Sequence, residues 1–355
     1  MLSDTKPGQA GREIDGGATR DLTDPTRALV VDDLEEGLKE PVFENLEIPE
    51  FLGRKTIRID DHKIKRYAFT VDDYHPWAFG ASPFGIRIAQ AGVVTNDIVQ
   101  LFTLKYRASH TVGLHTEEQL WFHRPIPVDS CVTLEGTYVE SYIRRGLGYV
   151  VMDATVTGPA GEKMMTHRGV EVLRTMPGEV GGRGSASPKS GERRITAEYD
   201  ATRPFILSAG RGMQVGAAIA PATKVITLEQ AAVFSRVGEY VRNAHNDLEI
   251  ARSGGLRVPI VQGQQQMCLL LGSLTRVFGK LWFESGWVQV KFLNTVNVFA
   301  PIAVGGCITG MTEDAGALWA ELDVWGQRSD GVLTMVGGAR CQVDESRPVT
   351  TGPVP

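Results

Sequence analysis

Side chains that could transfer a proton gather in one segment, residues 234–266, which reads FSRVGEYVRNAHNDLEIARSGGLRVPIVQGQQQ. A histidine near a second acid or base can exchange a proton with a reacting group close to neutral pH. His245 has three candidate partners, namely Tyr240, Glu239 and Asp247, of which Glu239 would need a one-residue bulge. The alternative interpretation is that His245 only caps the turn before the next helix.

An internal repeat indicates which elements position this segment. Phe122 and Phe292 stand at matching places in two strand-like runs, and two glycine pairs keep the same spacing of 170 residues (Gly136 with Gly306, Gly161 with Gly331). Three landmarks in register over about 40 residues indicate a duplicated unit. Two generic, unrelated domains are the less favoured alternative.

Each unit is predicted to contain one apolar helix followed by four antiparallel strands. The helices are expected at residues 84–102 and 256–279. The strands are expected at residues 115–125, 131–143, 148–158 and 162–174, and again at 287–296, 303–311, 318–326 and 333–343. The second helix is apolar nearly all round, which suits a helix inside a curled sheet. This α+β pattern is the hotdog arrangement, present twice.

The segment also resembles the signature of MaoC-like (R)-specific hydratases and dehydratases, D-x-N-P-x-H-x-D followed by P-I-x-H-G. His245 falls on the signature histidine and Asp247 on the following aspartate. Ala251, Gly255, Pro259, Ile260 and Gly263 also match. The resemblance covers about residues 50–345 and implies a double hotdog that acts on acyl thioesters without a cofactor or a metal ion.

Three positions depart from the signature. Tyr240 replaces its aspartate, Arg242 its asparagine, and Gln262 the histidine before the final glycine. In the family, the aspartate and the histidine together position a water molecule and move its proton. The resemblance therefore implies that His245, Tyr240 and Asp247 are the catalytic candidates.

Gly263 is expected at the start of the second helix. The first N–H groups of a helix have no internal acceptor, and the helix dipole adds partial positive charge there. A glycine would let a thioester carbonyl approach these donors, which would stabilise the developing enolate more than the ground state. Gly263 and Gln262 are therefore predicted to bind substrate, and Gly92 could act likewise in the first unit.

Arg242 places a permanent cation beside His245. Because burial of an unpaired guanidinium is costly, Arg242 should reach solvent, pair with a local acid, or meet an anionic group of the substrate. The sharper hypothesis is that Arg242 binds a carboxylate on an acidic acyl chain, for which arginine offers two parallel hydrogen bonds.

The first unit carries a thinner version of the motif. Asp73 and Pro76 match its start, but His75 stands in place of the asparagine and Ala78 in place of the signature histidine. We expect this unit to shape the acyl pocket. Asp73 and His75 remain weaker candidates for the missing acid/base partner.

Composition limits the other classes of function. A net charge of −5 without a basic block gives no reason to expect nucleic-acid binding. No stretch of about 18 apolar residues or secretory signal is evident, so a cytoplasmic protein without membrane contact is expected. The four cysteines have no metal-binding spacing and suit a reducing compartment. A homo-oligomer, a dimer of double hotdogs, is expected.

Residues 1–45 are predicted to form a mobile tail, 46–176 the first hotdog, 177–197 a linker, 198–345 the second hotdog and 346–355 a C-terminal tail. The leading functional hypothesis is a hydro-lyase that acts on an enoyl or 3-hydroxyacyl thioester of coenzyme A or an acyl carrier. The alternatives are a hotdog thioesterase and a divergent member that binds thioesters or modifies an unusual product.

Overall fold

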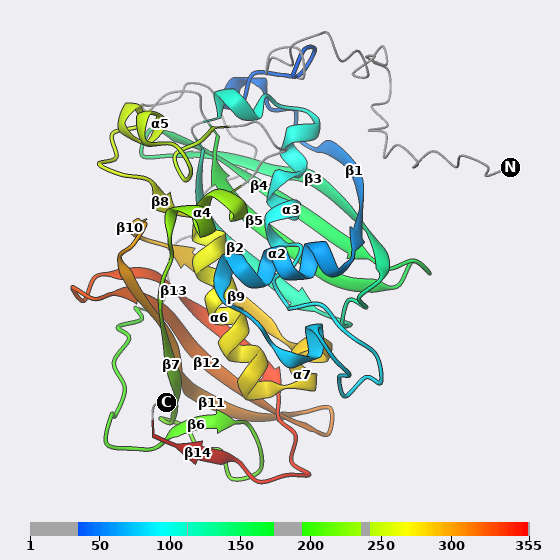
Figure 1. Ribbon diagram of the computed structural model, residues 1–355, viewed down its shortest axis with the longest axis vertical. Coiled ribbons are helices and arrows are strands. Elements are labelled where there is room, and N and C mark those ends of the chain that lie inside the picture. The colour runs from blue at the N-terminus through cyan, green and yellow to red at the C-terminus, as the bar shows by residue number, and fades with distance from the viewer. Residues whose placement is uncertain (1–34, 112, 174–193, 236–241, 354–355) are drawn as a thin grey trace, which may run out of the picture.

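One curled sheet of 12 strands dominates the computed structural model, which describes residues 35–111, 113–173, 194–235 and 242–353. Within these residues the strand order is β1-β3-β4-β5-β2-β9-β13-β12-β11-β7-β6-β14. Long helix α6 (Gly263–Phe278) lies against the sheet near its centre (Figure 1). The α+β class is therefore confirmed.

The first half of the sheet uses the four predicted strands and one that the sequence analysis missed. The missed strand is β1 (Glu50–Ile59). The predicted ones are β2 (Leu114–Phe122), β3 (Ser130–Arg144), β4 (Leu147–Thr157) and β5 (Lys163–Val172).

The second half repeats this order. Its predicted strands are β9 (Trp287–Phe292), β11 (Pro301–Asp314), β12 (Ala317–Arg328) and β13 (Leu333–Gln342). Three further strands, also missed, complete the edge: β7 (Ala218–Val225), β6 (Phe205–Ser208) and β14 (Thr350–Gly352).

Strand register confirms the repeat. Phe122 lies opposite Met165 in the first half, and Phe292 lies opposite Met335 in the second. The halves join where β2 pairs with β9, and at that junction Gln119 lies opposite Gln289, its own equivalent in the repeat. This pairing is what a pseudo-twofold axis between the two halves requires.

The two central helices differ. Helix α6 is buried along nearly its whole length, as its apolar sequence predicts. The first helix, predicted at 84–102, is much shorter: α3 (Thr95–Val99) continues as a 3-10 turn, η3 (Gln100–Leu104). The β-branched run at residues 93–95 has low helix propensity, which accounts for part of the difference.

Short elements cover the sheet and α6. Helix α2 (Asp61–Val71) contacts both α6 and α4 (Leu228–Phe234), and Figure 1 shows α2 and α4 near the start of α6. The others are α5 (Leu248–Ser253), α7 (Lys280–Ser285), β8 (Ile260–Val261), β10 (Val296–Asn297), η1 (Phe43–Asn45), η2 (Pro76–Ala78) and η4 (Ala108–His110).

Parts of both predicted terminal tails contact the rest of the protein. Residues 35–45 pack on the body, since the Glu35 carboxylate accepts from the Ser109 N–H (3.0 Å) and Phe43 is buried. Residues 350–352 form β14, which pairs with β6. The remainder of the expected N-terminal tail and most of the expected linker lie outside the described residues.

Candidate functional site

The motif loops of the two halves share one equivalent backbone hydrogen bond, although the second loop is longer and contains α5. In the second half the N–H of Ile260 donates to the carbonyl of Ala244 (3.2 Å). In the first half the N–H of Ile88 donates to the carbonyl of Trp77 (3.0 Å). His245 follows Ala244, and Ala78 follows Trp77, so these two side chains occupy equivalent positions. The gap-free alignment of the motif agrees with this geometry.

The ring of His245 is half-buried and fixed by the backbone. Its Nδ1 lies 2.8 Å from the carbonyl oxygen of Ile260, in the strand that leads into α6. A carbonyl can only accept, so Nδ1 carries the proton and Nε2 is the nitrogen that can take up another. Burial lowers the pKa of His245 to about 4, so the ring is neutral at pH 7 and Nε2 carries a lone pair that can accept a proton.

Asp247 and Arg242 form a surface arrangement. Asp247 caps α5 by accepting from the N–H groups of Glu249 (3.0 Å) and Ile250 (3.1 Å). The guanidinium of Arg242 pairs with Asp247 and Glu249, and its side chain is 61% exposed. The Arg242 contact holds the pKa of Asp247 below its usual range.

This arrangement bears on two hypotheses from the sequence, namely that Arg242 binds a substrate carboxylate and that Asp247 is the partner of His245. Arg242 adopts the internal ion pair, which was the alternative to a clamp on a substrate carboxylate. Asp247 is used by the helix cap and by Arg242, whereas the ring of His245 contacts a backbone carbonyl. Tyr240 and Glu239, the other candidate partners of His245, lie outside the described residues.

The start of α6 holds Gln262 and Gly263. Gln262 stands at the N-cap position without a side-chain cap, and its Oε1 is buried with no hydrogen-bond partner in the described chain. A Cβ added at Gly263 would stand 2.9 Å from the ring of Phe292. The glycine is therefore needed for Phe292 to pack here, a reason the sequence analysis did not give.

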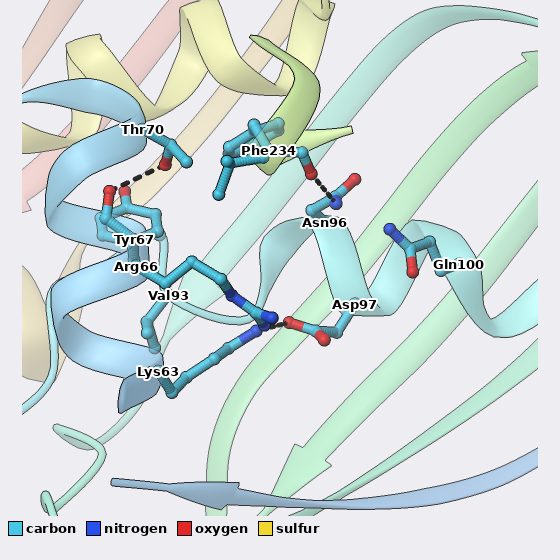
Figure 2. A pocket seen from close by; sticks show the side chains of 11 residues that line it. Lys63, Arg66, Tyr67, Thr70, Val93, Asn96, Asp97, Gln100 and Phe234 are labelled. Carbon is cyan, nitrogen blue, oxygen red and sulfur yellow. Dashed lines mark hydrogen bonds and ion pairs between the residues drawn. The ribbon is translucent and has the colours of Figure 1, made fainter. Parts of the chain in front are cut away.

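Two side chains occupy the space next to Gly92 where a Cβ would stand, so a substrate carbonyl cannot approach it from that side. A Cβ there would stand 2.2 Å from the hydroxyl of Tyr67 and 2.8 Å from the sulfur of Cys268. These side chains fill the space that the sequence analysis assigned to substrate. A small cavity of about 50 Å³ lies beside them, between α2, α3 and α4. Figure 2 shows its wall, with Lys63 extended toward Asp97.

Asp73 lies far along α6 from this site. A Cβ added at Gly272 would stand 3.5 Å from a carboxylate oxygen of Asp73. Gly272 is nine positions after Gly263, or about 13 Å at ~1.5 Å per residue of helix. His245, in contrast, contacts Ile260, before the helix begins. Asp73 is therefore not brought to His245.

The sequence analysis missed a buried polar cluster in the first half, made of His115, Glu118, His167 and Glu171. One oxygen of Glu118 lies 2.8 Å from His115 Nε2 and 2.9 Å from His167 Nε2. His115 Nδ1 lies 3.4 Å from Glu171. Gly169 makes room, because a Cβ there would stand 2.8 Å from the ring of His167.

Electrostatic interactions favour the charged forms of Glu118 and His115 in this polar cluster. Burial acts to raise the pKa of Glu118, but the neighbouring imidazoles outweigh burial and lower it. Burial likewise acts to lower the pKa of His115, but Glu118 and Glu171 outweigh it and raise the pKa. The ring of His115 also stands edge-on to Phe292, with 5.3 Å between centroids. The cluster thus adjoins the side chain that covers Gly263.

Among the described residues, no group of three or more His, Cys, Asp or Glu could hold a metal ion. No helix within those same ranges is long and apolar enough to cross a membrane. All four cysteines are free thiols.

Solved structures provide the comparison that decides the fold. A MaoC-like dehydratase is 19% identical, with a TM-score of 0.65 over 86% of this chain and 100% of its own. A MaoC-like dehydratase from Phytophthora capsici is 14% identical, with a TM-score of 0.59 over 86% and 98%. A conserved hypothetical protein from Mycobacterium tuberculosis, described as a double hotdog, is 13% identical, with a TM-score of 0.58 over 86% and 98%.

The chain is a double hotdog. Its fold is the one that the motif resemblance implied, shared with proteins named MaoC-like dehydratases. At these identities the likeness concerns the fold. No family model matches the sequence, and a comparison with curated proteins found no match.

Proposed function

We propose that this double hotdog is a hydro-lyase that adds water to an enoyl thioester or removes it from a 3-hydroxyacyl thioester. The observation that carries the proposal is the contact between His245 Nδ1 and the carbonyl of Ile260. It fixes the tautomer so that Nε2 is the basic nitrogen, beside the start of the buried helix α6. The shared fold with proteins named dehydratases supports the same reaction class.

In the direction of dehydration, Nε2 of His245 takes the proton from C2 of the thioester. The electron pair of the C2–H bond forms an enolate, whose oxygen accepts from the free N–H groups in the first turn of α6. Phe292 covers the Cβ side of Gly263, so the carbonyl approaches along the helix axis. The C3–O bond then breaks, and the imidazolium returns its proton to the departing oxygen, releasing water.

Two further side chains belong to this proposal. The buried Oε1 of Gln262, which lacks a partner in the described chain, would accept a hydrogen bond from the substrate hydroxyl or the attacking water. Tyr240 would supply the second polar group near His245. Arg242 has no part in it, because its guanidinium already binds two protein carboxylates at the surface.

The carrier and the assembly are also proposals. The thioester would belong to coenzyme A or to an acyl carrier protein. A dimer of double hotdogs and a cytoplasmic location, both expected from the sequence, stay predictions, and light scattering of the purified chain would test the first.

Crotonyl-CoA tests the proposed reaction. We expect the enoyl absorbance to fall without release of free thiol. Release of thiol would instead indicate a thioesterase, and binding without either change would indicate a divergent thioester-binding protein. Either of these results would overturn the hydro-lyase proposal.

A further inference from the structure

The first half contributes to a second, larger site on another part of α6. A cavity of about 400 Å³ lies between the middle of α6, strands β6 and β7, and the end of α2. Its volume falls in the range of small-molecule pockets. Apolar side chains such as Ile206, Leu269 and Val277 form part of its wall, and Asp73 and Arg276 supply charge. Neither His245 nor Gly263 lines it.

Asp73 is the buried polar group of this cavity. It is only 6% exposed, and its Oδ1 has no hydrogen-bond partner among the described residues. A buried carboxylate oxygen without a partner is costly, so native proteins almost always provide one. Burial also raises the pKa of Asp73, against the opposing effect of Arg276. The Oδ1 atom of this carboxylate therefore lacks a donor, and the other oxygen, Oδ2, is the one nearest to Gly272.

Arg276 faces the same space from the last turn of α6. A Cβ added at Gly272 would stand 3.5 Å from Asp73 Oδ2 and 3.7 Å from Arg276 Nη2. The two charged groups thus flank the point above Gly272 without forming an ion pair with each other. Arg276 is exposed to solvent, and within the described ranges its guanidinium has neither an ion pair nor a hydrogen bond. Lys224, also in the cavity wall, differs, since its ammonium lies 3.6 Å from Asp72.

Asp73 and Arg276 determine which chemical groups could bind between them. A group placed there would supply the donor that the buried Asp73 lacks, and it could also accept from the guanidinium of Arg276. A hydroxyl group does both, and so does a carboxamide, through its N–H and its carbonyl. We propose that this cavity binds an apolar chain bearing a hydroxyl or amide group, which bridges Asp73 and Arg276 above Gly272. This site is independent of the reaction proposed at His245.

Small probes test the site by calorimetry on the full chain. 1-Hexanol and hexanamide can both donate and accept, whereas hexyl methyl ether has the same apolar chain and only accepts. We expect one or both of the first two to bind at least tenfold more tightly than the ether. Comparing the affinities of 1-hexanol and hexanamide shows whether the site prefers a hydroxyl or an amide group. Equal binding of the ether, or no binding of any probe, would overturn the proposal.

Gly272→Ala is the sharpest variant. Its new methyl group would meet Asp73 and Arg276 only at ordinary contact distances, so the fold accommodates it. Alanine also favours the helix over glycine. We therefore expect an unchanged or higher melting temperature together with at least a tenfold loss of probe binding, because the methyl group fills the bridging position. Probe binding as tight as in the wild type would contradict the proposal.

Two further variants complete the test. Asp73→Asn should weaken the alcohol at least tenfold, and near-wild-type binding would count against the assignment of Asp73. His245→Ala should leave probe binding unchanged, because His245 does not line this cavity. Loss of binding in His245→Ala would mean that the two sites are one, which would also overturn the inference. Loss of hydration with retained probe binding would separate the two proposals.

Discussion

The two halves share their strand register and one backbone hydrogen bond in the motif loop, but they differ in the side chains at the motif positions. The first half has Asp73 at the motif aspartate and Ala78 at the motif histidine, whereas the second has Tyr240 and His245. One backbone hydrogen bond is equivalent in the two loops, but the second loop is five residues longer and contains α5, so the halves differ in both side chains and backbone. Each half therefore has one of the two residues of the motif, the aspartate in the first half and the histidine in the second.

The sheet interior differs in the same way. Glu118 lies opposite Gly169 in the first half, and the equivalent pair in the second half is Val288 opposite Ala339. Val288 is fully buried and apolar, so the fold does not require a charge at this place. The buried ions in the first half are an addition to the shared architecture, and their removal should distinguish the halves.

The largest effect on stability is expected from Glu118→Gln. The change leaves His167 buried without its carboxylate and His115 with Glu171 alone, and loss of one partner of a buried ion pair costs about 3–5 kcal/mol. Urea unfolding measures the change. The control replaces all four members of the polar cluster with apolar residues (His115→Leu, Glu118→Val, His167→Leu and Glu171→Leu) and should cost less. A quadruple variant less stable than Glu118→Gln would refute this account of the polar cluster.

Gly263→Ala should have the next largest effect. Its methyl group would stand 2.9 Å from the ring of Phe292, and overpacking of this kind costs about 1–3 kcal/mol. Adding Phe292→Leu to the same protein should recover part of the loss. If the alanine proves harmless alone, Phe292 does not constrain this position.

The pH dependence of stability should also separate the halves. The pKa of His115 is raised in the folded chain, so its contribution is complete below the ordinary value of 6.5 and is lost as the pH rises toward the raised value. The loss is at most ~1.4 kcal/mol per pH unit for one group. Urea unfolding at pH 6 and pH 9 should show a smaller decrease in the quadruple variant. The same decrease in both proteins would exclude His115 as its source.

Arg242→Gln should have the smallest effect on stability, because its ion pairs are exposed to solvent and screened by it. Hydration of acidic and neutral enoyl thioesters should change equally in this variant. A selective loss with acidic substrates would restore the carboxylate clamp that the structure does not support.

The repeat could be predicted from the sequence, because the alternation in the strands and the constant spacing of 170 residues can both be read directly from the order of the residues. It also placed Gly263 at the start of α6. It could not reveal that Phe292 needs this glycine, since the two residues meet only through tertiary packing. The cluster around Glu118 was missed for the same reason: its members lie on two strands, and only the pairing of β2 with β5 brings them together.

His245→Ala tests the central claim most directly, with crotonyl-CoA as substrate and hydration followed through the enoyl absorbance. We expect kcat to fall by about 10²-fold or more, because general acid–base transfer is lost, while the melting temperature stays close to that of the wild type. Replacement of the exposed His62 by alanine is the matched control and should leave kcat unchanged. Near-wild-type hydration in His245→Ala would contradict the account and remove this histidine from the reaction.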